Sequence, residues 1–417
     1  EVGDETDERF GRTDENRLTG GDGVNVIKGG AGDDTIFRSG GADVIDGGDG
    51  LDTLNYADAT SGVIFDMVNG LAGYRLGYTY DYATTDIDQV AGVERVIGGG
   101  FNDTMISSPG GAVFIGGGGN DDLVAGAGID IFDGGDGRDA VLFRDSTEAV
   151  KVDLAAGTGL GGLAEGDQYV SVEIAFGSLA DDELAGTSGD DMQVGWDGDD
   201  VIYGRDGDDI LSGYRGEDIV DGGDGNDTLW SGDPDFAMVA DLAAGTTGDG
   251  DTLISIENLN GAGLNDTLLG DGGVNILTGQ GGNDILNGRG GADTLDGGDG
   301  IDTASYADHT QGVTVDLAQG TASDGDTLIS IENVVGSAFD DTIGGTADDN
   351  TLDGGDGTDT VSYAAAAAAV TVNLGAGTAT GQGTDTLISI ENVTGSAFDD
   401  VLTGSDGANV IDGGDGF

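Results

Sequence analysis

The chain has no cysteine, one histidine and two prolines among 417 residues. Without cysteine no disulfide can form, and with a single histidine zinc has few of its usual ligands. A nucleophilic triad lacks the bases that it needs, and neither an HExxH nor a GxxxxGK[ST] motif occurs, so we do not expect an enzyme. The lone histidine, His309, lies in a turn-like stretch where exposure is a better prediction than catalysis, and the sequence assigns it no role.

Basic residues are also scarce, because 13 Lys and Arg stand against 81 Asp and Glu and give a net charge of −68. Such a charge argues against nucleic acid and anionic membrane surfaces as direct partners and favours cations. No run of eighteen apolar residues occurs, and no basic segment is followed by an apolar one. We therefore predict neither direct membrane insertion nor a cleaved secretory signal peptide.

Glycine, in contrast, is abundant, with 86 residues, and it recurs in a pattern. Residues 195–230 read GWDGDDVIY GRDGDDILS GYRGEDIVD GGDGNDTLW, four units of nine on the pattern G-G-x-G-x-D-x-U-x, where U is apolar. The glycine-rich half predicts a turn and the last three residues predict a short β-strand. A strand of three residues cannot bury its apolar side chain alone, so the units must stack on one another as a solenoid.

The same nine-residue phase recurs in six blocks, which together hold 27 complete units. Position six of these units is Asp in 21 cases, Asn in 5 and Ala in one, which a glycine-rich linker would not maintain. The blocks are residues 2–55, 98–142, 177–230, 261–305, 336–362 and 395–417. The last block stops at GGDGF, five residues into a unit, so we expect a fragment of a longer protein.

The nonapeptide resembles the calcium-binding repeat of the RTX (repeats-in-toxin, haemolysin-type) family. The resemblance implies an all-β parallel β-roll, or β-solenoid, with two units per turn, the U side chains inside and Ca²⁺ held between loops eighteen residues apart. Asp200 would then share an ion with Asp218, and Asp209 with Asp227. It also implies an extracellular or cell-surface location reached by type I secretion.

Calcium prefers six to eight oxygen ligands, which aspartate carboxylates and glycine-loop carbonyls supply. Stacked strands lie about 4.8 Å apart, so like charges in one column would repel by about 1 kcal/mol per pair in water and by about 3 to 4 kcal/mol at an effective dielectric near 20. We therefore expect roughly a dozen or more calcium ions, without which the roll would not hold. The predicted ligands are Asp34, Asp43, Asp52, Asp103, Asp121, Asp130, Asp139, Asp182, Asp191, Asp200, Asp209, Asp218, Asp227, Asp266, Asp284, Asp293, Asp302, Asp341, Asp359 and Asp400.

Five related segments, here numbered interruptions 1 to 5, separate the blocks. Each predicts two strands, the first alternating in polarity and the second reading DTLISIENL in its clearest copy, at residues 251–259. We expect these segments to continue the solenoid as wider rungs, with inward side chains such as Val313, Val315, Ile329 and Ile331. A tyrosine-rich stretch at 74–82 predicts an exposed loop, with no role that the sequence assigns. The interruptions are residues 56–97, 143–176, 231–260, 306–335 and 363–394.

Every copy of the second strand carries an Asp and a Glu six residues apart, as at Asp251 and Glu257. The even spacing places both on one face of an extended strand. They are either solvated carboxylates or, for the Glu, a group that ligates or orients the first calcium of the following block.

The second unit of a block departs from the pattern in five of six cases, with Asn16, Ala112, Asn275, Asn350 or Asn409 at position six. We predict that this unit faces an interruption, where a neutral amide suits a site without a partner loop.

Two classes of function remain. One is a structural or adhesive rod of a secreted or surface protein, such as an adhesin, a surface layer or a filament, with copies of itself or a surface component as partners. The other is the repeat module of a secreted enzyme or toxin whose catalytic domain lies elsewhere. The large number of units and the five patterned interruptions favour the first.

Overall fold

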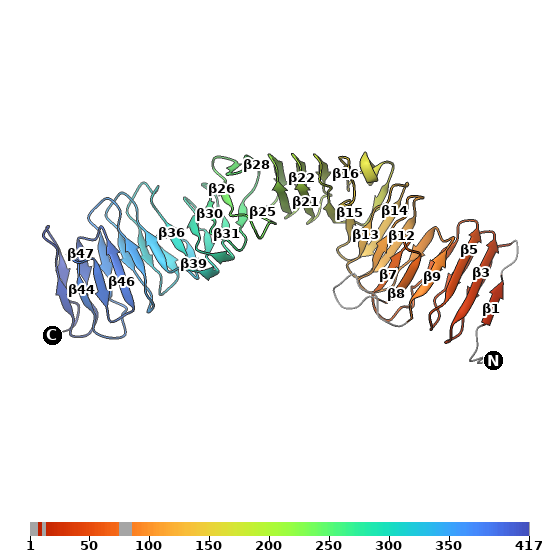
Figure 1. Ribbon diagram of the computed structural model, residues 1–417. Coiled ribbons are helices and arrows are strands. Elements are labelled where there is room, and N and C mark those ends of the chain that lie inside the picture. The colour runs from red at the N-terminus through yellow and green to blue at the C-terminus, as the bar shows by residue number, and fades with distance from the viewer. Residues whose placement is uncertain (1–6, 11–13, 75–85, 417) are drawn as a thin grey trace. The chain divides into compact units, whose positions relative to one another are not determined.

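The computed structural model describes residues 7–10, 14–74 and 86–416. It is built of short strands with one 3-10 helix, η1 (Gly162–Ala164), among the described residues (Figure 1). The chain divides into two compact units, residues 1–225 and 226–417, and each is described by itself. Most of the predicted loop at 74–82 lies outside the described residues, and Tyr74 is the last residue of strand β8 (Leu71–Tyr74).

In residues 1–225 the strands form two sheets, here called sheets A and B. Sheet A contains, in spatial order, β1 (Asp7–Phe10), β3 (Asn25–Ala31), β5 (Val44–Asp49), β9 (Asp88–Ala91), β8, β7 (Val63–Asp66), β11 (Thr104–Ile106), β13 (Asp122–Val124), β15 (Ala140–Leu142), β19 (Ile174–Phe176), β21 (Met192–Asp197) and β23 (Ile210–Arg215). Sheet B contains β2 (Arg17–Thr19), β4 (Thr35–Phe37), β6 (Thr53–Asn55), β10 (Arg95–Ile97), β12 (Val113–Gly118), β14 (Ile131–Asp136), β18 (Gln168–Val170), β17 (Thr158–Leu160), β16 (Lys151–Asp153), β20 (Glu183–Ala185), β22 (Val201–Asp206) and β24 (Ile219–Asp224).

Residues 226–417 form two further long sheets, C and D. Sheet C contains β25 (Thr228–Trp230), β29 (Asn258–Asn260), β31 (Ile276–Thr278), β34 (Thr294–Asp296), β39 (Thr327–Ile329), β38 (Thr321–Ala322), β37 (Thr314–Asp316), β41 (Thr342–Gly344), β43 (Thr360–Ser362), β47 (Asn392–Thr394) and β49 (Ile411–Asp412). Sheet D contains β28 (Thr252–Ile254), β27 (Thr246–Thr247), β26 (Val239–Asp241), β30 (Thr267–Leu269), β33 (Ile285–Asn287), β36 (Thr303–Ser305), β40 (Asn333–Val335), β42 (Thr351–Asp353), β46 (Thr384–Ile388), β45 (Thr378–Thr380), β44 (Thr371–Asn373) and β48 (Val401–Thr403). A short pair, β32 (Gly281–Gly282) and β35 (Asp299–Gly300), joins two loops.

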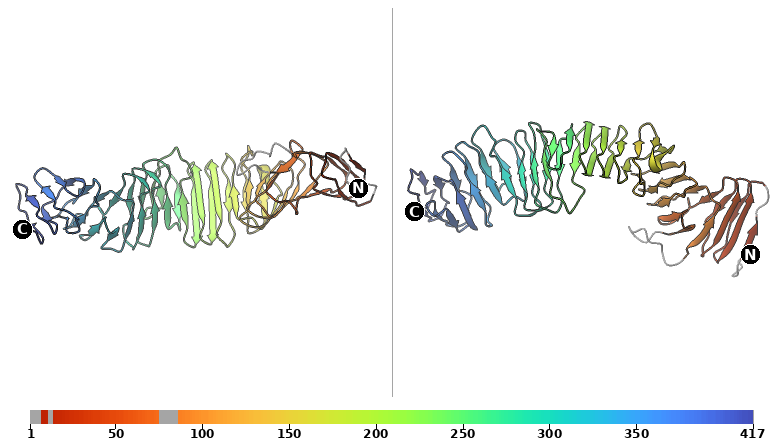
Figure 2. Two further views of the ribbon diagram at one scale, coloured as in Figure 1. Left: turned by 90° about the horizontal axis from the view of Figure 1, so that it is seen from below. Right: turned by 45° about the horizontal axis from the view of Figure 1, so that its top comes forward.

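Neighbouring strands within a block are parallel and eighteen residues apart, as Val201 and Ile219 are in sheet B, so two nonapeptides make one turn. The predicted parallel β-roll is confirmed, and the stacked strands of each unit are visible from two directions in Figure 2. Position eight points inward, and Ile202 and Phe114 are fully buried there. Each such side chain contributes about 1.5 to 3 kcal/mol of burial free energy. The column of position-eight side chains is thus the core of each unit.

The interruptions join the sheets, as predicted, but the prediction of two strands was wrong. In interruption 1, strands β7, β8 and β9 form a zigzag in sheet A, between β5 and β11, and β10 continues in sheet B. The middle strand runs antiparallel to both neighbours. It is formed by the glycine-rich segment that was expected to be a turn, which is extended and hydrogen-bonds on both sides. The other four interruptions repeat this arrangement.

The segment DTLISIENL is not one strand, because it bends at Ser255, whose φ of 49° is left-handed. Strand β28 precedes the bend in sheet D and β29 follows it in sheet C. Equivalent residues with positive φ are Gly92, Ser171, Ser330 and Ser389. The bend shifts the alternation, so Leu328 is buried while Ile329 is 42% exposed, and the prediction of an inward Ile329 was wrong. Val313, Val315 and Ile331 are buried as predicted.

Each zigzag widens one sheet only. Interruption 1 adds two strands to sheet A, about 10 Å of sheet, while β6 and β10 pair directly in sheet B. Interruption 2, which follows after a block of five nonapeptides, widens sheet B. In residues 226–417 the zigzags of interruptions 3, 4 and 5 lie in sheets D, C and D, separated by five and by three nonapeptides.

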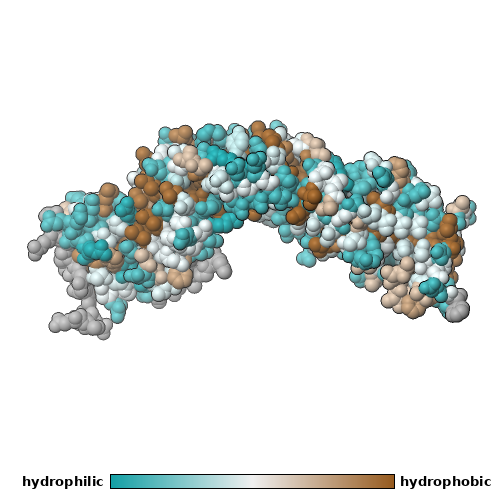
Figure 3. Space-filling view, turned by 180° about the vertical axis from the view of Figure 1, so that it is seen from behind, coloured by the Kyte–Doolittle hydropathy of each residue, from teal (hydrophilic) through white to brown (hydrophobic). Residues whose placement is uncertain are grey.

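The surface is largely hydrophilic, with apolar residues dispersed in small groups (Figure 3). Position seven points outward and contributes several of these residues, such as Ile210, Ile219 and Ile285. Among the described residues, no helix is long and apolar enough to cross a membrane. The run of six alanines at 364–369 forms turns and bends without helix.

We expect Ile202→Ala to lower the free energy of unfolding by about 2 to 4 kcal/mol, because it opens a cavity in the fully buried column. Ile210→Ala, at the outward position of the next unit with 36% exposure, is the matched control and should cost less than about 1 kcal/mol. Urea unfolding in saturating calcium, followed by circular dichroism, measures both. Equal losses would contradict the assignment of position eight to the core.

Candidate metal centres

The aspartates at position six line the loops between strands. Of the twenty predicted ligands nineteen are buried, and Asp400 is half-buried. Within blocks, one carboxylate oxygen accepts the main-chain N–H of the residue eighteen positions earlier: Asp200 Oδ1 lies 2.7 Å from the nitrogen of Asp182, and Asp121 Oδ1 lies 2.7 Å from that of Asp103. Each aspartate therefore ties its own loop to the loop one turn before.

The second oxygen, Oδ2, divides the loops into two kinds. In the first kind, here called uncapped loops, Oδ2 is buried and has no hydrogen-bond donor among the described residues. A buried carboxylate oxygen without a donor or a cation is unfavourable. Uncapped loops contain Asp34, Asp52, Asp121, Asp139, Asp200, Asp284, Asp293, Asp302 and Asp359.

The backbone at position two explains the uncapped state, whereas the close approach of the carboxylate to the position-one glycine is common to both kinds of loop, as at Gly336 beside Asp341 in the second kind. A Cβ added to the position-one glycine would lie 2.0 Å from Oδ2 of Asp200 at Gly195, and 1.9 Å from Oδ2 of Asp121 at Gly116. The carboxylate thus rests directly on this glycine. Position two is left-handed, with φ of 104° at Gly117 and 80° at Trp196, which turns its N–H away from the aspartate.

In the second kind, here called capped loops, residue two of the same loop donates to the position-six side chain. In the loop of Asp341, the N–H of Ser337 lies 2.6 Å from Oδ2 and its hydroxyl lies 2.9 Å from Oδ1. Residue two does not have a positive φ in these loops. Capped loops contain Asp43, Asp103, Asp130, Asp182, Asp191, Asp266, Asp341 and Asp400.

The remaining predicted ligands are Asp209, Asp218 and Asp227. They follow a left-handed second residue, at Arg205, Tyr214 and Gly223, as uncapped loops do. Asp218 Oδ1 accepts the N–H of Asp200 at 2.8 Å, so the predicted pair of Asp200 and Asp218 lies in adjacent turns.

A second ladder, which sequence reasoning missed, involves position five. Its Asp or Asn side chain accepts the N–H of the residue eighteen positions later, as Asp181 does from Asp199 at 3.0 Å. Asn102 does the same for Asn120 at 3.0 Å. The recurrence of Asp or Asn at position five was the available signal. Positions five and six therefore bind adjacent turns in opposite directions.

The interruptions end the ladder of the block before them. Glu94 Oε2 accepts the N–H of Asp52 at 3.0 Å, and Glu257 accepts that of Asp227 at 2.8 Å. The bend at residues such as Ser255 directs the Glu to the last aspartate of the preceding block, a contact that the sequence did not predict. That the Glu also serves the first calcium of the following block stays a prediction. The same contact recurs at Glu173, Glu332 and Glu391. The aspartates that precede these glutamates by six residues accept N–H groups from the second-to-last nonapeptide of the preceding block; they are Asp88, Asp167, Asp326 and Asp385.

The second units of blocks 2 to 6 face the preceding interruption, as predicted. The side-chain amides of Asn275, Asn350 and Asn409 donate to the carbonyls of Glu257, Glu332 and Glu391, each at 2.7 Å. An uncharged donor thus meets the carbonyl at each of these junctions.

Burial raises the pKa of the carboxylate in eight of the nine uncapped loops. Desolvation raises the pKa of Asp121 and of Asp200 to about 8, although the N–H bonds to Asp103 and Asp182 oppose it. It raises the pKa of Asp139, Asp284 and Asp359 to about 6. Neighbouring aspartates of the column add to several of these shifts. A bound cation would reverse both causes.

The residues fit calcium. Among the described residues, no three His, Cys, Asp or Glu side chains gather as a metal cluster, so each site would combine carboxylates with loop carbonyls, as calcium accepts. Oδ2 of an uncapped aspartate is the natural ligand. His309 Nε2 lies 2.9 Å from Asp324 Oδ2 and its ring packs against Tyr306. Its side chain is 14% exposed, so the predicted exposure was wrong.

Stacked parallel strands joined by aspartate-lined loops define a β-roll with repeated cation sites. A family model described as RTX calcium-binding nonapeptide repeat matches residues 10–45, 39–58, 115–143, 176–211, 194–229, 269–304, 331–365 and 380–417, more than half of the chain. The chain belongs to this family and is a calcium-binding repeat protein. A search of curated proteins finds no match.

We expect Asp200→Asn to raise the calcium concentration needed for folding by at least about threefold, because it removes the charge of an oxygen without a protein donor. Asp182→Asn is the matched control, since Ser178 already satisfies that carboxylate. Calcium titration followed by circular dichroism gives both midpoints, and equal shifts would contradict the division into uncapped and capped loops.

Calcium-free protein should be more stable in acid than at neutral pH. The folded-state pKa of Asp121 and Asp200, about 8, lies above the unfolded value, so the folded chain binds more protons and its stability falls as pH rises from about 4 to about 8. Calcium must displace these protons, so its affinity should rise over the upper part of this window. Calorimetric titrations at about pH 6 and about pH 8 test this; identical affinities would refute it.

Proposed function

We propose that the chain is a calcium-folded structural or adhesive region of a secreted or cell-surface protein and is not itself catalytic. The observation that carries the proposal is the column of buried Oδ2 atoms in uncapped loops, which need a cation for the fold to be stable. In each loop the aspartate and the glycine-loop carbonyls would hold the ion. The ion supplies positive charge between turns and no chemistry.

The distribution of these loops supports a mechanical role. Uncapped aspartates occur in five blocks, from Asp34 to Asp359, so cations would brace most of the chain rather than one local site. The interruptions add paired backbone instead of protruding domains. Copies of the chain or a surface component are the proposed partners.

The dependence of folding on calcium also bears on how the chain leaves the cell. Extracellular calcium modules have dissociation constants of about 10⁻⁴ to 10⁻³ M. At the far lower free calcium inside a cell, the carboxylates would remain uncompensated and the chain unfolded. Type I secretion, typical of the family, passes unfolded chains and is the proposed route.

The test is a calcium titration of the whole chain. We expect little β-signal in chelator and cooperative folding with a midpoint of about 10⁻⁴ to 10⁻³ M calcium. Magnesium at equal concentration is the control and should fold the chain poorly, because it requires a tighter octahedral shell. A full β-signal in chelator would overturn the proposal.

A further inference from the structure

The first strand of every interruption ends in an Asp or Asn that begins a tight turn. The N–H of the residue three positions later donates to its Oδ1, over 2.9 Å at Asp66, Asp153 and Asp241 and over 3.0 Å at Asp316 and Asn373. This turn satisfies one side-chain oxygen. In the four aspartates a second, charged oxygen remains to be satisfied.

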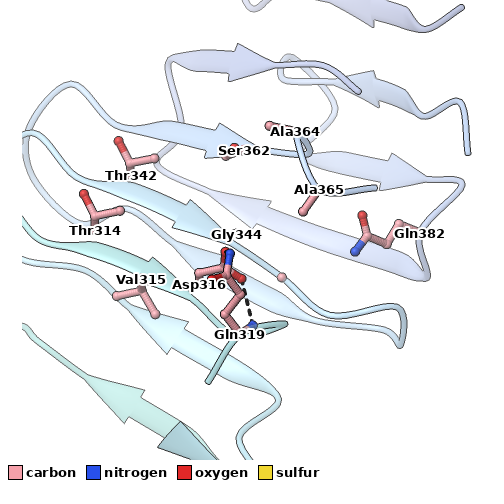
Figure 4. Close-up of a pocket in the computed structure, with 11 residues that line it drawn as sticks. Thr314, Val315, Asp316, Gln319, Thr342, Gly344, Ser362, Ala364, Ala365 and Gln382 are labelled. Atoms are coloured by element: carbon pink, nitrogen blue, oxygen red, sulfur yellow. Dashed lines mark hydrogen bonds between the residues drawn. The ribbon is translucent and has the colours of Figure 1, made fainter. Parts of the chain in front are cut away.

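Two copies satisfy it with a neighbouring amide. Asn69 donates to Asp66 Oδ2 at 2.6 Å, and Gln319 donates to Asp316 Oδ2 at 2.7 Å. Figure 4 shows Gln319 bonded to Asp316 beside Gly344. The amide belongs to the residue three positions after the aspartate, so the whole arrangement is local.

The other two aspartates have alanine at that place, Ala156 and Ala244, and an arginine reaches them from the following block. Arg205 lies 2.8 Å from Asp153 Oδ2 and 2.7 Å from the carbonyl of Gly186.

Arg289 makes the same contacts in the second copy. It holds Asp241 through two bonds of 2.6 and 2.8 Å and the carbonyl of Gly270 at 2.8 Å, and its Nε also donates to Asp308 Oδ2 at 3.1 Å. Both arginines occupy position two of the fourth unit of their block. Each arginine therefore links three successive layers of the sheet: the aspartate of the zigzag strand, the loop carbonyl of Gly186 or Gly270 one turn on, and its own loop a further turn on.

The fifth copy shows what happens without a charge. Asn373 replaces the aspartate, and Ala376 lies three positions later. The second polar atom of the Asn373 side chain is an amide nitrogen, which needs no hydrogen-bond donor. Across the five copies, an arginine is thus found where a charged aspartate lacks a local amide.

Both arginines occupy a left-handed backbone position that side chains rarely adopt, as Trp196, Tyr214 and Gln280 also do in other loops. Arg205 and Arg289 have φ of 89° and 64°, where glycine is cheaper and is the usual residue of the repeat. Arg289 is, in addition, the only Lys or Arg among residues 226–417. The ion pairs lower the pKa of Asp153 and Asp241, through hydrogen bonds from Arg205 and Arg289.

We propose that Arg205 and Arg289 are built-in cations that clasp interruptions 2 and 3 to the following block and replace calcium at these two joints. The turns after Asp153 and Asp241 carry no acidic side chain of their own, LAAG at 154–157 and LAAG at 242–245, so each turn offers a calcium ion a single carboxylate, and Asp308, beside Arg289, would add a second at the Asp241 joint. The guanidinium supplies the charge instead. The inference rests on the proposal that calcium fills the uncapped loops.

The test uses the whole chain in saturating calcium, with peptide-resolved hydrogen exchange. Arg289→Met should speed exchange of residues 238–247 by about fivefold to twentyfold, because Asp241 loses a charge-assisted pair. Exchange at residues 313–323 of interruption 4, where Gln319 serves Asp316, is the internal control and should not change.

Two further variants separate the clasp from general damage. Ala244→Gln added to Arg289→Met copies the arrangement of Gln319, and Asp241→Asn added to Arg289→Met copies that of Asn373; both should restore most of the protection. Unchanged exchange in Arg289→Met, or no recovery in either double variant, would overturn the clasp. If the wild type folds in chelator, the calcium proposal fails, and the same variants compared in chelator still decide the clasp.

Discussion

Carboxylates buried one strand spacing apart are the constraint on which the rest of this structure depends. Parallel stacking brings Asp182, Asp200 and Asp218 into one column, and each Oδ1 bonds the turn before it while crowding negative charge together. At about 4.8 Å, two such charges repel by about 3 to 4 kcal/mol at an effective dielectric near 20. The glycine at position one, the left-handed residue at position two and the choice between capped and uncapped loops are all answers to this crowding.

The second oxygen of these buried carboxylates is satisfied in different ways along the chain. In uncapped loops the second oxygen is left for a cation. In capped loops, which include the first loop of blocks 2 to 6 and the loops of Asp43 and Asp130 inside blocks, a donor of the same loop satisfies it, as Ser337 does for Asp341. At junctions the carbonyl of Glu257 meets the amide of Asn275, and the carboxylate of Asp241 meets Arg289. Metal dependence is thereby concentrated in the uncapped loops, and the joints use donors carried by the protein.

The period of nine, the inward position eight and the stacking of the aspartates in columns could be predicted, because each follows from a pattern repeated many times. The path of the interruptions could not. Ser255 adopts a left-handed φ that serine rarely takes, so DTLISIENL reads as one strand although it serves two sheets. The two kinds of loop were hidden for a related reason: Trp196 and Arg289 occupy left-handed positions that only glycine would have revealed.

The alternation of sheets makes the number of repeats between interruptions a matter of parity. Successive nonapeptides enter opposite sheets, and blocks of five and three units carry the next zigzag from sheet A to B, from D to C and from C to D. Gain or loss of eighteen residues would leave every later zigzag in its own sheet. Gain or loss of nine residues would transfer every later zigzag to the opposite sheet. The sequence therefore repeats every nine residues, but only insertions or deletions of two nonapeptides preserve the sheet in which each later zigzag lies.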